Sequence, residues 1–228
     1  MQVKKPVKKL ERSIYRFTQL LVRIFLRLFF GCRYSYEQEI PTTGPLIVAS
    51  NHISYFDPPS VGAGIPREDI HFMAKKELFR NPIFGALINF YHAVPIRRNG
   101  MDWKGIAWIK KILNEGRAII LFPEGTRQKE GNLGQPRFGV GMLAQKTGAG
   151  ILPVYARGTG RLLDAFLRRR PMRILYGRII QPEEYAGFDP TPKGQLAISR
   201  MVMERILALK EKCEAWNEGQ KQSWGMLE

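Results

Sequence analysis

From residue 41 onward, short apolar runs alternate with segments that have the periodicity of amphipathic helices. This alternation predicts an α/β domain in which helices flank a mostly parallel sheet. We expect strands at residues 46–50, 70–74, 93–97, 118–122, 151–157 and 172–179. We expect helices to begin at Asp57, Lys76, Trp103 and Phe138, and a last amphipathic helix to span residues 195–216.

The N-terminal residues 8–30 have a different pattern, in which arginines recur within a long apolar segment. Placed at about 100° per residue, the arginines gather on one side and a broad apolar group gathers on the other. Charge interrupts the segment too often for a membrane span, which needs about 20 apolar residues. We therefore expect a helix lying at a membrane surface, the alternative being a helix packed on the core with solvated arginines. The basic side comprises Arg12, Arg16, Arg23 and Arg27, and the apolar side Leu10, Phe17, Leu21, Ile24, Phe25 and Leu28.

We expect two parts in the chain, a basic amphipathic membrane-association segment at residues 1–33 and an α/β domain at residues 34–228, and the distribution of charge supports this division. A net charge of +16 indicates a polyanionic partner, either nucleic acid or an anionic membrane. Residues 1–30 hold eight basic residues against Glu11 alone. These basic residues alternate with long aliphatic side chains. The alternation favours a membrane over nucleic acid as the partner, because binding of nucleic acid would not require buried aliphatic side chains. With only Cys32 and Cys213, the sequence lacks a disulfide framework and zinc spacing, and it favours a reducing, cytosolic environment.

A histidine and an aspartate follow the buried strand predicted at residues 46–50. His52 comes just past the carboxyl end of that strand, where open α/β sheets collect functional groups. Asp57 stands five positions later, so the chain must turn before it if the two side chains are to meet. A histidine oriented by a carboxylate can act as a general base toward an alcohol. Alternatively, Asp57 and Pro58 are a helix N-cap and first helical residue, a pairing that needs no catalysis to explain it, although both roles can coexist because a carboxylate has two oxygens.

A second polar cluster follows the strand predicted at residues 118–122. Glu124 can accept a hydrogen bond from a hydroxyl, and Arg127 can bind phosphate through its planar fork. They begin residues 123–137, a long stretch without apolar periodicity that predicts a functional loop. The alternative is a surface turn with an ion pair.

Two adjacent arginines stand at the end of the strand predicted at residues 93–97, Arg97 as its last residue and Arg98 directly after it. Strand alternation sends them to opposite faces, so only one of them can face the site. The other histidines, His71 and His92, have no ligand partner at metal spacing, and we expect no metal.

In this order and at these intervals, the motifs resemble the glycerolipid acyltransferase family, specifically its 1-acylglycerol-3-phosphate O-acyltransferases, over roughly residues 34–181. Residues 51–57 are similar to the family's His-x4-Asp catalytic motif, and residues 122–127 to its glycerophosphate motif. Three further matches are Arg98 in the second motif, Pro153 in the fourth, and Lys75, where the family commonly has a lysine. Positions that depart from the usual pattern are His92, Arg97, Gln128 and Arg137.

The resemblance implies that His52 removes the proton of the glycerol 2-hydroxyl and that Asp57 orients its imidazole. It implies that Glu124 and Gly125 position the glycerol. The residues implied as phosphate ligands are Arg98, Arg127 and Lys75.

The resemblance also implies the partners and the location. The acceptor would be lysophosphatidic acid, and the donor acyl-CoA or acyl-carrier protein, with no cofactor and no nucleic acid. The protein would be peripheral or monotopic on the cytoplasmic face of a membrane, such as a bacterial inner membrane. The remaining alternative is a non-catalytic protein whose basic residues, including residues 168–170, bind nucleic acid or an anionic membrane.

Overall fold

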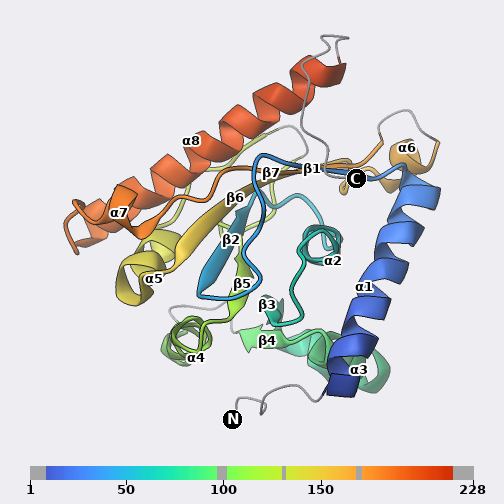
Figure 1. The fold of residues 1–228 in the computed structure, drawn as a ribbon, viewed down its shortest axis with the longest axis horizontal. Coiled ribbons are helices and arrows are strands. Elements are labelled where there is room, and N and C mark those ends of the chain that lie inside the picture. The colour runs from blue at the N-terminus through green and yellow to red at the C-terminus, as the bar shows by residue number, and fades with distance from the viewer. Residues whose placement is uncertain (1–8, 97–101, 130–131, 168–170, 218–228) are drawn as a thin grey trace.

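A seven-stranded sheet in the order β1-β7-β6-β2-β5-β3-β4 forms the centre of the molecule (Figure 1). The computed structural model describes residues 9–96, 102–129, 132–167 and 171–217. Every described pair of neighbouring strands is parallel except β6 and β7, which are antiparallel. The strands are β1 (Arg33–Tyr36), β2 (Leu46–Ser50), β3 (Ile70–Lys75), β4 (Ala93–Ile96), β5 (Ala118–Leu121), β6 (Gly150–Arg157) and β7 (Arg173–Tyr176).

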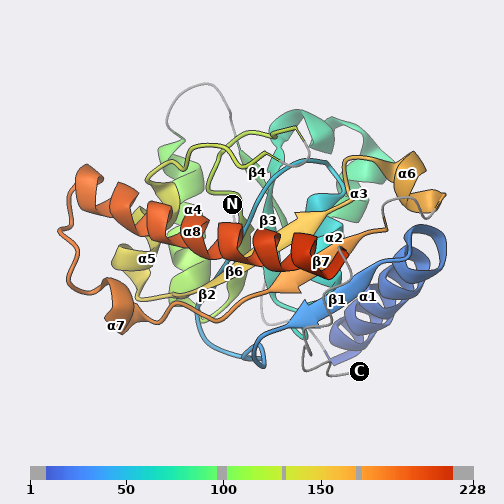
Figure 2. The same ribbon diagram turned by 90° about the horizontal axis from the view of Figure 1, so that it is seen from above.

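Helices cover both faces of the sheet, so its central strands are buried on both sides and are apolar almost throughout. On one face Ile47 and Ile151 pack with α4, α5 and α8. On the other, Val48 and Leu152 pack with α1 and α2. Figures 1 and 2 show these layers. The helices are α1 (Lys9–Phe30), α2 (Asp57–Ala63), α3 (Pro82–Phe90), α4 (Trp103–Asn114), α5 (Gly139–Thr147), α6 (Leu162–Phe166), α7 (Pro182–Tyr185) and α8 (Pro192–Asn217).

The predicted α/β architecture is confirmed, with differences at short elements. Six predicted strands match β2 to β7, but the sequence did not indicate β1, α6 or α7. The helix expected at Lys76 begins as a short 3-10 helix, η1 (Lys76–Arg80), and α3 follows it. Residues 123–137 contain no helix or strand in their described part, as predicted.

Helix α1 packs on the domain through a narrow side and exposes a broad apolar one. Tyr15 and Leu26 are buried, and the side chain of Gln19 donates hydrogen bonds to the carbonyl oxygens of Gly62 and Arg67, each at 3.1 Å. The eight apolar residues named below are each more than 40% exposed, and we call them the α1 apolar face. They are Ile14, Phe17, Leu20, Leu21, Ile24, Phe25, Leu28 and Phe29.

The arginines of α1 lie between its packed side and the apolar face, and all four are exposed. The helix therefore contacts the core, as the alternative reading expected, and it also presents exposed apolar side chains to the outside. Its place at a membrane surface stays a prediction. Across the described ranges, the helices are all too short or too polar to traverse a bilayer.

A buried histidine, His71, links the sheet to α1, and its lowered pKa predicts that the stability of the fold decreases in acid. His71 stacks on His92, which stacks on Tyr15 of α1. Nδ1 of His71 donates to the carbonyl oxygen of Asp69 at 2.9 Å. Burial, assisted by the nearby His92, lowers the pKa of His71 from 6.5 to about 4.

We expect this shift to cost stability on acidification. The folded-state pKa of His71 is below its unfolded value, so its contribution is complete above about pH 6.5 and is lost as pH falls toward 4. The maximum loss is about 3 kcal/mol. His71→Asn keeps a donor near Nδ1 but cannot take up a proton. Urea unfolding across this pH range should therefore show a steeper decline for the parent protein, and parallel declines would contradict the prediction.

Candidate active site

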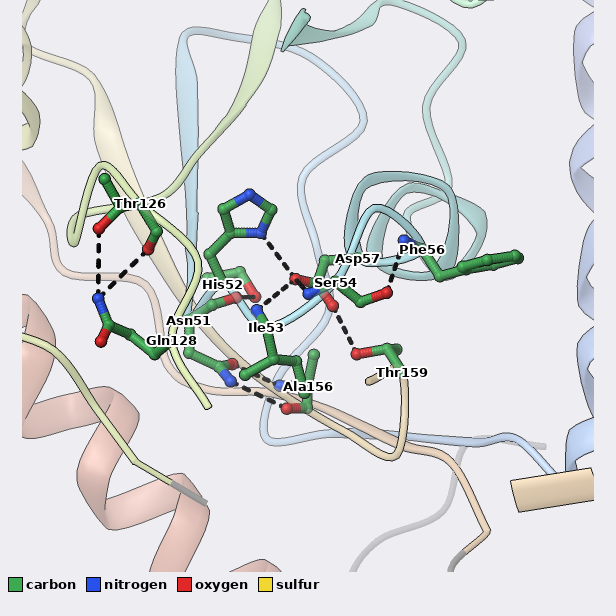
Figure 3. Close-up of polar contacts among 11 residues, drawn as sticks. Asn51, His52, Ile53, Ser54, Phe56, Asp57, Thr126, Gln128, Ala156 and Thr159 are labelled. Atoms are coloured by element: carbon green, nitrogen blue, oxygen red, sulfur yellow. Dashed lines mark hydrogen bonds and ion pairs between the residues drawn. The ribbon is translucent and has the colours of Figure 1, made fainter. Parts of the chain in front are cut away.

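His52 and Asp57 meet at the carboxyl end of β2, as the sequence predicted (Figure 3). A turn closed by the hydrogen bond from the Asp57 backbone N–H to the Ser54 carbonyl brings the side chains together. Nδ1 of His52 lies 2.7 Å from Oδ2 of Asp57, and both side chains are buried. An ionised carboxylate only accepts hydrogen bonds, so Nδ1 carries the proton and Nε2 keeps its lone pair. The arrangement leaves Nε2 as the basic atom of the pair.

The Asp57 carboxylate is fixed by four hydrogen bonds. Oδ2 accepts from His52 and from the backbone N–H groups of Ile53 and Ser54, at 2.7 and 2.8 Å. Oδ1 accepts from the hydroxyl of Thr159 at 2.5 Å. The alternative of Asp57 as an N-cap is wrong, because Phe56 precedes the helix and Asp57 is its first residue. Its carboxylate turns back to the preceding loop and holds the imidazole.

Thr159 is a site residue that sequence reasoning missed. It follows β6 after Gly158, whose φ of 83° is a conformation that favours glycine. Asn51 anchors the same end of β6, since its amide donates to the Ala156 carbonyl at 2.9 Å and accepts from the Ala156 N–H at 2.7 Å. These contacts set the position of Thr159 relative to Asp57. The sequence contains no local signal for a partner 102 positions away.

The loop after β5 lies directly against the histidine. The ring of Phe122 stacks on His52, with centroids 3.9 Å apart and planes inclined by 17°. The backbone N–H of Gln128 donates to the His52 carbonyl at 2.7 Å, and the Gln128 side chain donates to Thr126. The two motif segments predicted from sequence therefore form one site.

Glu124 is buried in this loop at 3% exposure, and neither carboxyl oxygen meets a donor in hydrogen-bond geometry within the described residues. Burial raises its pKa to about 7, opposed by the nearby backbone N–H groups of Gly134 and His52. A buried carboxyl group without partners is costly, and a bound hydroxyl would relieve that cost. Glu124 is thus placed to receive a ligand.

The backbone conformation of the loop explains why a glycine follows Glu124. Gly125 has a φ of +71°, which side chains disfavour, and a Cβ there would lie 3.0 Å from the side chain of Arg137. That contact brings Arg137 alongside the turn that contains Arg127. The loop therefore presents two exposed cations next to the buried carboxyl group.

Arg127 lies over the ring of Tyr55, with its guanidinium carbon 3.9 Å from the ring centroid. Lys75, at the end of β3, forms an ion pair with Glu77 at 3.7 Å, and both side chains are about half exposed. Arg97 and Arg98 lie outside the described residues, as do residues 168–170. The structure thus places Glu124, Gly125 and Arg127 beside the His52–Asp57 pair. The roles of Lys75 and Arg98 stay predictions.

This geometry suits transfer of an acyl group to an alcohol. It combines an oriented imidazole, a buried carboxyl group that can accept from a hydroxyl, and exposed guanidinium groups that can bind an anion. No group of three or more His, Cys, Asp or Glu side chains suited to a metal ion occurs among the described residues.

Comparisons with known proteins agree with this chemistry. The model of a family described as Acyltransferase matches residues 32–157. A 1-acyl-sn-glycerol-3-phosphate acyltransferase from Bacillus subtilis is 27% identical over 88% of this chain and 99% of its own length. A chloroplastic protein of the same description from Arabidopsis thaliana is 29% identical over 67% of this chain, but this match spans only 43% of the relative.

The fold has a solved counterpart. The crystal structure of a 1-acyl-sn-glycerophosphate acyltransferase from Thermotoga maritima aligns with a TM-score of 0.72 and 23% identity. The alignment covers 93% of this chain and 85% of that one. At this identity the likeness concerns the fold.

Proposed function

Because the chain belongs to the acyltransferase family, we propose that it transfers a fatty acyl group from a thioester to the 2-hydroxyl of 1-acylglycerol 3-phosphate, giving phosphatidic acid. The observation that carries the proposal is the buried His52–Asp57 pair, against which the loop with Glu124 and Arg127 is packed. The described function of the Bacillus subtilis relative supports this acceptor. Family membership disfavours a non-catalytic polyanion-binding protein.

In the proposed reaction, Nε2 of His52 removes the proton of the acceptor hydroxyl as its oxygen attacks the thioester carbonyl. The tetrahedral intermediate then expels the thiolate, which takes the proton from the imidazolium. Asp57 keeps the proton on Nδ1 and stabilises the transient positive charge. No acyl group is attached to the enzyme at any step.

Acceptor recognition would use the loop after β5. The carboxyl group of Glu124, whose oxygens have no hydrogen-bond partner among the described residues, would accept from a glycerol hydroxyl. The left-handed turn at Gly125, against which Arg137 packs, would help to position the glycerol. Arg127 would bind the phosphate with charge-assisted hydrogen bonds. We propose Arg98 and Lys75 as additional phosphate ligands on the basis of the family resemblance alone.

We propose that the α1 apolar face enters a lipid surface. Leucine and phenylalanine side chains would lie in the acyl region while the arginines beside them meet lipid phosphates. The expected location is the cytoplasmic face of a membrane, where acyl-CoA or acyl-carrier protein would supply the acyl group.

Acyl transfer by the purified protein tests the proposal. Radiolabelled acyl-CoA and acyl-carrier protein would be offered with lysophosphatidic acid, glycerol 3-phosphate and lysophosphatidylcholine. We expect phosphatidic acid from lysophosphatidic acid and much less product from acceptors that lack its exposed phosphate or its acyl chain. Failure with every acceptor, together with salt-sensitive retention on DNA, would overturn the proposal in favour of a nucleic-acid-binding protein.

Tyr55 provides a test of the phosphate site. Replacing Tyr55 by leucine should raise the KM for lysophosphatidic acid about two- to fivefold with kcat nearly unchanged, because an exposed cation–π contact contributes about 0.5–1 kcal/mol. Tyr55→Phe retains the ring under Arg127 and serves as the matched control. Equal KM values for the leucine and phenylalanine variants would show that the ring does not position Arg127.

A further inference from the structure

A second apolar surface lies on the short helix α6. Leu163, Phe166 and Leu167, at and just after the helix, are 70%, 53% and 46% exposed. The inner side of the helix is fixed, because Ala165 is fully buried and Leu162 packs on the core. Leu163 and Phe166 of α6 therefore face outward, while Leu162 and Ala165 face the protein. We call these three exposed residues the α6 apolar tip.

The α6 apolar tip belongs to the same side of the molecule as α1. Figures 1 and 2 show α6 beside the C-terminal end of α1, although the two are far apart in sequence. The segment after α6 is tied to this end, since the N–H of Met172 donates to the Phe30 carbonyl and the Arg173 guanidinium donates to the Gly31 carbonyl, each at 3.1 Å. The exposed apolar side chains at this end of α1 are Phe25, Leu28 and Phe29.

We propose that α6 is a second membrane-insertion element, which enters the same anionic bilayer leaflet as α1. This proposal rests on the membrane association proposed for α1. Contiguous exposed apolar side chains mark sites of interaction with a protein or a membrane, and the arginine stripe of α1 beside them complements anionic headgroups, which favours the membrane. Arg161 precedes α6, is about half exposed and forms an ion pair with Asp164 at 3.6 Å. The occupant of this surface is therefore a lipid leaflet carrying negative charge.

The position of α6 connects the membrane to the catalytic pair. α6 follows the turn that contains Thr159, whose hydroxyl donates a hydrogen bond to the Asp57 carboxylate. α1 packs on α2, which begins at Asp57, through the side chain of Gln19. Phe56, 39% exposed, points from the start of α2 toward the side on which α1 lies (Figure 3). The two insertion elements thus flank the Asp57 end of the site, so that a lipid acceptor could keep its acyl chain in the leaflet while its hydroxyl reaches the histidine.

Vesicle flotation tests the proposal, with vesicles of equal parts phosphatidylcholine and phosphatidylglycerol. The α6 variant carries Leu163→Glu and Phe166→Glu, and the α1 variant carries Phe17→Glu and Leu21→Glu. Leu207→Glu with Ala208→Glu is the matched control, because it adds the same two charges at exposed positions of α8, away from this surface. We expect about tenfold weaker vesicle binding for the α6 variant, as for loss of partly inserted Leu and Phe side chains, and unchanged binding for the control. Turnover of a short-chain, water-soluble lysophosphatidic acid should be the same in the α6 variant and in the control as in the parent protein.

The outcomes separate this proposal from the one on which it rests. Wild-type binding by the α6 variant, with binding lost in the α1 variant, would overturn the role of α6 and leave membrane association intact. If neither variant binds more weakly, both proposals fail. If the α6 variant also loses turnover of the soluble acceptor, Leu163→Trp decides the question. Quenching of its added fluorescence by brominated phospholipid supports insertion, and the absence of quenching overturns it.

Discussion

Replacing His52 by alanine is expected to lower kcat for phosphatidic acid formation by about 1000-fold, within the range usual for loss of a general base. Nε2 is the basic atom of the pair and has no hydrogen-bond partner among the described residues, whereas Asp57 Oδ2 accepts three hydrogen bonds and Oδ1 accepts one from Thr159. KM for lysophosphatidic acid should change little, because the proposed acceptor contacts lie on the loop after β5. Steady-state kinetics over both substrates measures this split.

Two further variants separate base catalysis from folding. His52→Asn can still donate to Asp57 from a position near Nδ1, but it lacks a base at the position of Nε2. It should therefore fold like the parent protein and be as inactive as His52→Ala. His71→Asn removes another buried histidine away from the site and should keep kcat within about threefold at neutral pH. Activity within tenfold of the parent for His52→Asn would exclude His52 as the base.

The central strands could be predicted because their physical environment is simple. β2, β5 and β6 are covered on both faces, so each is a continuous apolar run that is visible in the sequence. β1 lacks this signal. Its four residues, RYSY, form a strand only by pairing with β7, in a register from Arg33 with Arg173 to Tyr36 with Tyr176. Pairing over so long a separation is set by tertiary packing and not by local pattern.

The site was predictable to the extent that its residues follow strands. Parallel strands end at one edge of the sheet, so His52 after β2 and Glu124 after β5 were expected to lie together. The partners that align them were not predictable. Thr159 follows β6, whose end is tied to the catalytic loop by the hydrogen bonds between Asn51 and Ala156, and its own hydroxyl bonds Asp57. A threonine between two glycines has no feature that indicates a carboxylate partner.

α1 illustrates a different limit, because one sequence pattern allowed two readings. Helical periodicity identified a basic side and an apolar side, but it did not show which part packs on the domain. The packing uses a narrow side of the helix that includes Tyr15, Gln19, Val22 and Leu26, with one polar residue among apolar ones. The remaining apolar residues stay exposed, which periodicity alone cannot distinguish from a core-facing surface.

Replacing Asp57 by asparagine is expected to lower kcat about 100- to 1000-fold while preserving the fold. The asparagine amide group can take the place of Oδ1 and donate to Thr159, whose hydroxyl can also accept. The asparagine oxygen can then take the place of Oδ2 and accept from His52, Ile53 and Ser54. All hydrogen bonds would be kept and only the negative charge lost. The loss of kcat would thus measure how far that charge stabilises the imidazolium formed when the acceptor loses its proton.

Thr159 makes this interpretation testable, because its hydroxyl changes from donor to acceptor in the Asp57→Asn protein. Thr159→Val in the parent should lower kcat about tenfold, consistent with loss of one hydrogen bond to a charged group worth about 1.5 kcal/mol. In the Asp57→Asn background the same change should cost much less, since the bond it removes no longer involves a charge. Thr159→Ser, which keeps the hydroxyl, should stay near the parent in both backgrounds. Equal effects of Thr159→Val in the two backgrounds would mean that Thr159 acts on packing of the turn after β6, and that the charge of Asp57 is oriented by the backbone N–H groups of Ile53 and Ser54 alone.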